Sequence, residues 1–403
     1  MKKKILFINS SNFGSTGNIV KTLGNQLSNS YDFYYSYPKT RSNLKNLSTN
    51  TILIGDILFR NIGIFISKIF GLHNLLSIFS TLSYIKKIRK IKPDLVHIHN
   101  LHNGYINIVL LCKFLQSSKI KIIWTLHDTW SFTGKCVHFS SANCNKWITE
   151  CNNCPLLRNY PDSLVDNSNF LFKIKKKLFT KFNKTDIVFI TPSNWLSDQV
   201  KLSFLKEYKV SVIPNGIDTN IFKISKHYFE SFKRLTQFKH VILGVANNWN
   251  DRKGLKIFSD LSKLIPNNQV VVLVGSIPNN FRIMNPNIIF IERTTSKNEL
   301  ASIYNNSKVF LNPSEEETMG MVTIEALACG LPVVVSNFTA VPEYVTKDIG
   351  VIVKNHNAVS YCNVIQELIS SNLIKPEICS LKATQFNLAN FSRLYSEAYL
   401  NLL

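Results

Sequence analysis

One stretch, residues 308–336, constrains the fold more than any other, and its sequence is KVFLNPSEEETMGMVTIEALACGLPVVVS. Its apolar run 309–311 is followed by a proline and a serine, which predicts a buried strand and its turn. Residues 318–329 carry apolar side chains at helical spacing, and Gly330 then provides a helix stop. The β-branched run 332–335 is too short for a helix and is typical of a central parallel strand. The stretch therefore predicts a strand, a loop, a helix and a second strand.

The start of this predicted helix is a candidate phosphate site, because free backbone N–H groups and the positive end of the helix dipole lie there. Two carboxylates, Glu317 and Glu325, stand eight positions apart around the helix. Eight residues span roughly 12 Å along a helix axis, which is comparable to a nucleotide-sugar laid over the helix start. A carboxylate accepts two hydrogen bonds from the neighbouring hydroxyls of a sugar or a ribose. The alternative is a solvated acidic helix start, which the helix dipole also favours.

The segment S-E-E-E-T-M-G-M-V-T-I-E-A-L-A-C-G-L-P-V-V resembles the signature of the family 4 retaining glycosyltransferases. The resemblance implies an α/β protein of the GT-B fold, with two Rossmann-like domains facing a central cleft. It implies that Glu317 holds the donor sugar as a catalytic residue and that Glu325 holds the ribose. The other residues that it assigns to substrate binding are Thr318, Met319, Gly320 and Met321, and the amides of the last three would hold the phosphates.

Histidines stand at the ends of two predicted strands, within residues 92–100 and 121–128. Ligands of open parallel sheets bind at the carboxyl ends of strands, so His99, His102 and His127 are candidates for one site. A single histidine at a strand end is more often structural, which is the alternative. The T-x-H-D segment of residues 125–128 resembles the same family, and this implies a catalytic His127 that hydrogen-bonds the donor sugar.

Two further segments are assigned to substrate binding. Residues 13–18 form a glycine-containing loop before a helical pattern, and the resemblance assigns only Gly17 of this loop to substrate binding. An ordinary strand-to-helix turn is the alternative.

Arg252 and Lys253 follow the predicted strand 240–246, where positive charge would stabilise a departing diphosphate. Lys253 matches the family motif, whereas Arg252 is assigned from its neighbourhood because the family's usual arginine is absent. A solvated basic loop is the alternative. The resemblance implies catalysis without a metal cofactor.

Four cysteines cluster in the sequence with the spacing C-x7-C-x6-C-x2-C: Cys136, Cys144, Cys151 and Cys154. In a reducing compartment this spacing favours a structural zinc site with four thiolate ligands over disulfides, and free thiols remain the alternative. The segment 134–160 is similar to a cysteine-containing insertion found in a subset of the family that serves capsule and exopolysaccharide synthesis.

The length of 403 residues favours two domains. The resemblance implies an acceptor-binding Rossmann-like domain over residues 1–218 and a nucleotide-sugar-binding one over 219–385, with residues 219–239 as the connection. Residues 386–403 would form a helix that crosses back to the first domain.

The net charge of +22 attracts anions: nucleic acid, anionic lipid or phosphorylated substrates. No recognisable nucleic-acid-binding motif is present, so we expect no nucleic-acid partner. Two basic and apolar stretches, residues 60–90 and 170–184, are candidates for contact with an anionic membrane, and the second is favoured. Core-facing helices with solvated lysines are the alternative. The short apolar run 5–8 does not suit a secretory signal, so we expect a cytoplasmic protein at the inner face of the plasma membrane.

These features together predict a retaining glycosyltransferase that moves a sugar from a nucleoside diphosphate-sugar to a saccharide acceptor. The acceptor is expected to be lipid-linked, in the synthesis of bacterial capsule or lipopolysaccharide. Two alternatives are a nucleotide-sugar 2-epimerase of the same fold and a non-enzymatic basic nucleic-acid-binding protein. A glycogen-type phosphorylase would require a pyridoxal lysine motif that the sequence does not show.

Overall fold

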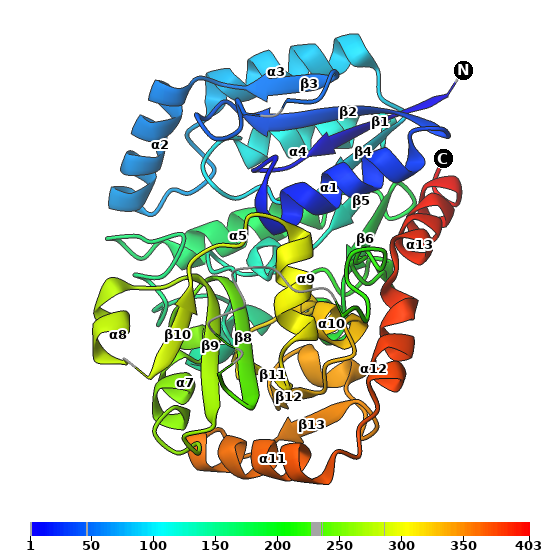
Figure 1. Ribbon diagram of the computed structural model, residues 1–403. Helices are drawn as coiled ribbons and strands as arrows, with labels where there is room; N and C mark the ends of the chain where they lie inside the picture. Colours follow the sequence, from blue (N-terminus) through cyan, green and yellow to red (C-terminus); the bar gives the residue numbers. More distant parts are fainter. Residues whose placement is uncertain (1, 46, 227–234, 236, 286) are drawn as a thin grey trace. The chain divides into compact units, whose positions relative to one another are not determined.

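The chain folds into two compact units, described by a computed structural model over residues 2–45, 47–226, 235, 237–285 and 287–403 (Figure 1). The first unit comprises Met1–Pro214 together with Phe391–Leu403, and the second comprises Asn215–Asn390. The expected connection, residues 219–239, lies partly outside the described residues.

The first unit is built on a parallel sheet of seven strands in the order β3-β2-β1-β4-β5-β6-β7. The strands are β1 Lys3–Ile8, β2 Tyr31–Pro38, β3 Thr51–Ile54, β4 Leu95–Ile98, β5 Lys121–Thr125, β6 Ile187–Thr191 and β7 Val210–Val212. The strand order reverses between β1 and β4, and such a switch point opens a crevice at the carboxyl ends of the strands. The first unit is therefore Rossmann-like.

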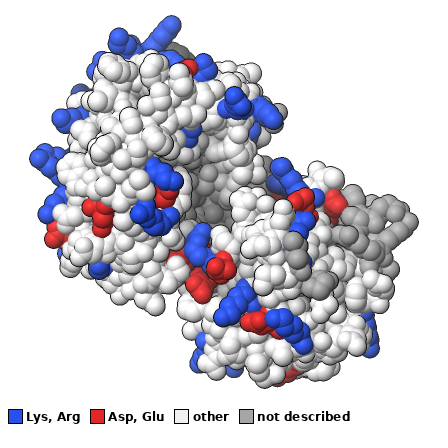
Figure 2. Space-filling view, turned by 90° about the vertical axis from the view of Figure 1, so that its left-hand side faces the viewer, with Lys and Arg blue, Asp and Glu red and all other residues white. Residues whose placement is uncertain are grey.

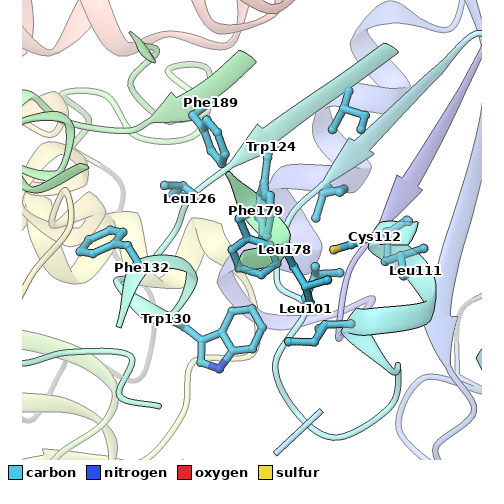
Figure 3. Packing of buried hydrophobic residues seen from close by; sticks show 14 of the residues in the cluster. Leu101, Leu111, Cys112, Trp124, Leu126, Trp130, Phe132, Leu178, Phe179 and Phe189 are labelled. Atoms are coloured by element: carbon cyan, nitrogen blue, oxygen red, sulfur yellow. The ribbon is translucent and has the colours of Figure 1, made fainter. Parts of the chain in front are cut away.

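The helices of the first unit cover this sheet: α1 Gly14–Leu27, α2 Ile57–Phe70, α3 Ile78–Ile91, α4 Ile108–Ser117, α5 Ser168–Phe179, α6 Asn194–Leu202 and the end of α13 Leu388–Leu400. Figure 3 shows part of the core between β5 and α5, where Trp124 meets Phe179 and Phe189. The Trp124 ring lies edge-on to Phe179 with centroids 4.9 Å apart, and it stacks on Phe189 at 5.6 Å. Aromatic side chains thus fix α5 onto the sheet.

The second unit is built on a parallel sheet of six strands in the order β10-β9-β8-β11-β12-β13. The strands are β8 His240–Asn248, β9 Gln269–Ser276, β10 Ile288–Ile291, β11 Val309–Asn312, β12 Val333–Ser336 and β13 Gly350–Val353. The helices are α7 Leu255–Leu261, α8 Asn279–Met284, α9 Lys297–Asn305, α10 Met321–Ala328, α11 Ala358–Ser371 and α12 Pro376–Ala383. Its switch point lies between β8 and β11, so this unit is Rossmann-like as well.

The predicted strand, loop, helix and strand of residues 308–336 are confirmed as β11, α10 and β12. The helix begins three residues later than predicted, at Met321 instead of Thr318. Gly320 precedes it in the left-handed conformation, with φ of 77°, and this breaks the helical path. Thr318, Met319 and Gly320 are therefore loop residues.

The two basic and apolar stretches differ in burial, and the preference for the second one was wrong. Leu171, Phe172 and Leu178 of α5 are buried, so α5 is a core-facing helix. Lys175 is buried as well, and the other lysines of the helix are exposed. The apolar side chains of α2, in contrast, are largely exposed: Phe59 is 72% and Phe65 64% accessible. No helix of the described residues is long and apolar enough to cross a bilayer.

Lys and Arg side chains are more abundant than Asp and Glu on the molecular face drawn in Figure 2. This agrees with the net charge of +22.

Gly17 lies within the first turns of α1, and the loop that precedes the helix folds closely over it. A Cβ atom at Gly17 would lie 2.6 Å from the backbone carbon of Asn12 and 3.0 Å from the oxygen of Ser11. The loop is itself fixed, because the side-chain amide of Asn12 donates to the backbone carbonyl oxygens of Asn43 and Lys45 at 2.8 and 3.1 Å. Gly17 therefore permits a close approach of backbone to backbone.

Gly17→Ala is expected to lower the free energy of unfolding by about 1–3 kcal/mol, because the added methyl group overlaps backbone that cannot move away. Gly63→Ala in α2 is the matched control, since its Cβ would meet only Leu76 at 3.9 Å. There the better helix propensity of alanine should stabilise the protein by about 0.5–1 kcal/mol. Chemical denaturation of both variants measures the two effects, and effects of the same sign would contradict this account of Gly17.

Candidate functional site

The candidate site of the second unit forms where two loops meet at the switch point between β8 and β11. A 3-10 turn, Asp251–Lys253, follows β8, and residues 313–320 follow β11. The Glu315 amide donates to the Arg252 carbonyl oxygen at 2.9 Å, so the two loops share a backbone hydrogen bond. Gly254 lies against Pro313, because a Cβ there would be 2.4 Å from the proline ring. The loops are thus fixed to each other by backbone contacts.

Two ion pairs join the same loops. The Lys253 Nζ lies 2.5 Å from Glu317 Oε1, and both residues were predicted for the site. The Arg252 Nη1 lies 2.8 Å from Glu316 Oε2, and the Glu316 side chain is only 2% exposed. Sequence reasoning missed Glu316, although its place in the acidic run E-E-E was a usable signal. The structure therefore brings Arg252, Lys253 and Glu317 into one cluster.

The backbone around the start of α10 is held in a defined shape. The Tyr344 hydroxyl donates to the carbonyl oxygens of Met319 and Gly320. The Met319 side chain is buried, and its sulfur accepts a hydrogen bond from the Asn215 amide at 3.0 Å. The Thr323 amide donates to the Gly320 carbonyl oxygen at 2.9 Å, whereas the amides of Met321 and Val322, at the very start of α10, precede any intrahelical acceptor. This is the arrangement that binds an anion.

Glu325 lies in the middle of α10 and is partly buried. The Tyr304 hydroxyl, from α9, donates to Glu325 Oε2 at 3.3 Å. Burial raises the pKa of Glu325 to about 7, against the opposing effects of Lys297 and of the Tyr304 hydrogen bond. Tyr304 was not predicted, because its contact with Glu325 depends on how α9 packs beside α10.

The first unit has its own cluster at the carboxyl ends of β4 and β5. The Nε2 of His127 lies 2.8 Å from Nδ1 of His99. Nearby, His102 Nε2 lies 2.9 Å from Asp128 Oδ2, and the Tyr160 hydroxyl lies 3.0 Å from His102 Nδ1. Burial lowers the pKa of His127 to about 4, so its ring is neutral at pH 7. The three histidines singled out in the sequence thus lie at one edge of the sheet.

The structure does not support the zinc site that the spacing of the four cysteines suggested. Among the described residues, no three His, Cys, Asp or Glu side chains are arranged to hold a metal ion. Burial raises the pKa of Cys136 to about 12 and that of Cys151 to about 11, so both thiols are protonated at pH 7. All four are free cysteines.

Two buried lysines support this segment instead. Lys135 Nζ donates to the carbonyl oxygens of Leu156, Leu157 and Asn159 at 2.8–3.2 Å. Lys175 Nζ, from α5, donates to the carbonyl oxygens of Trp130 and Thr133 and lies 3.6 Å from the centre of the Trp130 ring. Charge-assisted hydrogen bonds from Lys135 therefore hold the insertion together, and Lys175 connects α5 to the residues just before it.

Arg252→Ala is expected to lower the free energy of unfolding by about 2 kcal/mol, because the buried Glu316 carboxylate loses its cationic partner. Adding Glu316→Gln to Arg252→Ala should recover most of that loss, since the neutral amide needs no counter-charge. Chemical denaturation of the two single variants and the double variant measures the coupling. Strictly additive losses would contradict a role for this pair in holding the two loops together.

Comparison with known proteins gives two family matches, and both families are glycosyltransferases. Residues 58–221 match the family described as Glycosyltransferase Family 4, and residues 228–386 match the one described as Glycosyl transferases group 1. WcaC of Escherichia coli K12, assigned to colanic acid biosynthesis as a glycosyl transferase, is 27% identical over 91% of this chain and 84% of its own length. An N,N'-diacetylbacillosaminyl-diphospho-undecaprenol alpha-1,3-N-acetylgalactosaminyltransferase of Campylobacter jejuni is 25% identical over 58% of this chain and 62% of its own.

Solved structures share the fold at low sequence identity. Sucrose-phosphate synthase of Thermosynechococcus elongatus has a TM-score of 0.73 and 15% identity, covering 100% of this chain and 99% of that one. HepE of Anabaena in complex with UDP-glucose has a TM-score of 0.68 and 14% identity, covering 98% and 99%. Both units of this chain have the Rossmann-like sheets of the GT-B fold. The two family matches follow one another along most of the sequence, and the chain is a glycosyltransferase that belongs to family 4.

Proposed function

We propose that this enzyme transfers a sugar from a nucleoside diphosphate-sugar to a saccharide acceptor, with retention of configuration at the anomeric carbon. The observation that carries the proposal is the pairing of Lys253 with Glu317 beside the start of α10. This pairing supports the proposal because it brings a cation and a carboxylate together beside the start of a helix at the switch point of the second unit, where an open α/β sheet binds its ligand.

The donor would lie across this cluster. The diphosphate binds the amides of Met319, Gly320 and Met321, Glu317 accepts hydrogen bonds from the sugar hydroxyls, and Glu325 accepts them from the ribose. When the nucleotide binds, Lys253 exchanges part of its contact with Glu317 for the phosphate. Thr318 belongs to the same loop and contacts the donor beside Glu317.

The transfer breaks the bond between the anomeric carbon and the diphosphate oxygen and forms a bond from that carbon to an acceptor oxygen. Negative charge grows on the leaving diphosphate, where Arg252, Lys253 and the helix start stabilise it. The acceptor proton passes to the released diphosphate. These groups supply the positive charge that a divalent metal supplies in other enzymes, so no metal takes part in catalysis. His127 donates a hydrogen bond to the transferred sugar, and Gly17 shapes the loop on the acceptor side.

The relatives point to the acceptor class. The names of the Escherichia coli and Campylobacter jejuni relatives refer to colanic acid biosynthesis and to a diphospho-undecaprenol substrate. By analogy, the acceptor here is a lipid-linked saccharide in the synthesis of a bacterial surface polysaccharide. No family match supports the alternatives of a 2-epimerase or of a non-enzymatic nucleic-acid-binding protein.

Purified protein incubated with a panel of UDP-, GDP- and other nucleotide-sugars should release nucleoside diphosphate in the presence of a lipid-linked saccharide. Glu317→Gln and Glu325→Gln should each reduce kcat/KM by at least about 100-fold, because an amide is a weaker acceptor of the sugar hydroxyl bonds that strengthen in the transition state.

Glu367→Gln, an exposed residue of α11, is the matched control and should retain full activity. Mass spectrometry of products with and without acceptor separates transfer from hydrolysis or epimerisation. Near-normal turnover in both glutamate variants, or donor conversion that needs no acceptor, would refute the assignment.

A lipid-linked acceptor implies that the enzyme works at the inner face of the plasma membrane, and α2 is the surface suited to that contact. Its exposed apolar side chains recur at helical spacing: Leu58, Phe59, Ile62 and Phe65. The same unit has further exposed side chains on α3: Phe79 near its start and the basic residues Lys86 and Lys90 further along it. Apolar side chains with nearby lysines bind anionic leaflets, each lysine contributing about 1 kcal/mol.

The protein should sediment with phosphatidylglycerol vesicles at low salt, bind phosphatidylcholine vesicles less, and dissociate at high salt. The double substitution Phe59→Ser with Phe65→Ser should weaken vesicle binding by about tenfold or more, because two aromatic side chains leave the lipid. The double substitution Leu373→Ser with Leu381→Ser is the control, since both leucines are exposed in the second unit. Absence of binding to anionic vesicles at low salt would remove the membrane proposal.

A further inference from the structure

The segment that follows β12 runs along the loop that follows β11, residues 313–320. The Ser336 hydroxyl, at the end of β12, donates to the Ser314 carbonyl oxygen at 2.5 Å. Further on, the Tyr344 hydroxyl donates to the carbonyl oxygens of Met319 and Gly320. Side chains of one segment thus hold the backbone of the other near both of its ends.

Glu317 lies between these contacts and is held by two neighbouring residues. Its amide donates to the Thr339 hydroxyl oxygen at 2.9 Å, and its carbonyl oxygen accepts a hydrogen bond from the Ala340 amide at 3.3 Å. Its carboxylate pairs with Lys253. Both backbone polar groups of Glu317 and its side chain therefore have a defined partner.

The backbone of Thr339 is left-handed, with φ of 52°. A β-branched residue rarely adopts this conformation, because its Cβ atom comes too close to the following carbonyl oxygen. Of the seven non-glycine residues with positive φ in the described part of the chain, five are asparagines, which tolerate it, and Thr339 is the only β-branched one. Backbone strain is therefore expected at Thr339 more than at the others.

Glycine would adopt the same turn without strain, so the threonine side chain has to be explained by what it contributes. It contributes the oxygen that accepts the Glu317 amide, next to the Ala340 amide that bonds the same residue. Strained residues gather at ligand-binding sites, where the surrounding structure holds them in place. The contact with Glu317 is thus what threonine adds to this turn, and glycine would lose it.

We infer that Thr339 is a positioning residue, whose hydroxyl fixes the backbone of Glu317 and with it the place of the Glu317 carboxylate. The inference rests on the proposed function for the contact of that carboxylate with the donor sugar. Without the hydroxyl, the Glu317 amide loses its acceptor, and the loop after β11 is less firmly held at this residue. A displacement of about 1 Å in a reacting group can cost about 100-fold in rate.

Three variants separate the effect of the hydroxyl from that of the strain. Thr339→Ser keeps the hydroxyl. Thr339→Val keeps the β-branched shape and removes the hydroxyl. Thr339→Gly removes both the hydroxyl and the strain.

Hydrogen exchange of the Glu317 amide measures the contact directly. Spectra of protein with ¹⁵N-labelled glutamate give the exchange rate, and the signal is assigned from its loss in Glu317→Gln. We expect exchange to be about tenfold or more faster in Thr339→Val and Thr339→Gly than in the wild type, and nearly unchanged in Thr339→Ser. The amide of Glu367, in the middle of α11, is the internal control and should exchange at the same rate in all four proteins.

Kinetics and thermal stability provide the second readout. Thr339→Val and Thr339→Gly should both lower kcat by about 10- to 100-fold with little change in the donor KM, whereas Thr339→Ser should retain most of the rate. Thr339→Gly should nevertheless have a Tm about 2–4 °C above that of Thr339→Val, because only glycine relieves the left-handed strain. Lys92→Gly is the matched control, since exposed Lys92 of the first unit also has a positive φ, of 54°, and its replacement should leave kcat unchanged.

Equal exchange rates of the Glu317 amide in the wild type and in Thr339→Val would overturn the inference, and so would rates of catalysis that follow Tm instead of the hydroxyl. If no donor in the panel is turned over, that result counts against the proposed function alone, and the exchange rates still decide the role of Thr339. If Thr339→Val fails to fold, Thr339→Gly and Thr339→Ser provide the same comparison of exchange and rate.

Discussion

The structure of the candidate donor site depends on cationic side chains after β8 that meet carboxylates after β11. Two ion pairs join residues that are 64 positions apart in sequence: Lys253 with Glu317 and Arg252 with Glu316. Their meeting follows from the strand order, because β8 and β11 are neighbours at the point where the order reverses. The glutamates would otherwise repel one another, and the two cations balance them. The pairs therefore stabilise the meeting of the two loops, and in the proposed donor complex Lys253 would share its contact between Glu317 and a phosphate.

The first unit carries a different set of groups. Histidines, a tyrosine hydroxyl and the Asp128 carboxylate lie at the ends of β4 and β5, and burial keeps the His127 ring uncharged. A neutral imidazole suits a hydrogen bond to a sugar hydroxyl, whereas a charged one would repel the positive charge that builds on the anomeric carbon. The two units thus carry different side chains at the ends of similar sheets: two ion pairs in the second unit, and histidines with Asp128 in the first.

Local pattern predicted much of the fold, and tertiary packing decided the rest. The strands β11 and β12 were predictable because a short apolar run bounded by turn residues is typical of a buried strand and is too short for a helix. Contacts such as Tyr304 with Glu325 were not, because they depend on how two helices pack. Both α2 and α5 combine apolar and basic residues, but the apolar side chains of α2 are exposed and those of α5 are buried. The sequence did not show this difference, which depends on contacts such as that of Phe179 with Trp124. The spacing of the four cysteines suggested a zinc site. Spacing alone could not predict how these side chains are arranged in space, nor the backbone contacts of Lys135 and Lys175.

The central claim is that a diphosphate binds at the start of α10, between Lys253 and the first helix amides. A crystal structure of the protein with a bound nucleoside diphosphate tests it most directly. The account predicts phosphate oxygens within hydrogen-bond distance of Lys253 Nζ and of the amides near Gly320, with the ribose hydroxyls on Glu325. A nucleotide bound away from the carboxyl ends of β8 and β11, or a ribose that leaves Glu325 untouched, would contradict it.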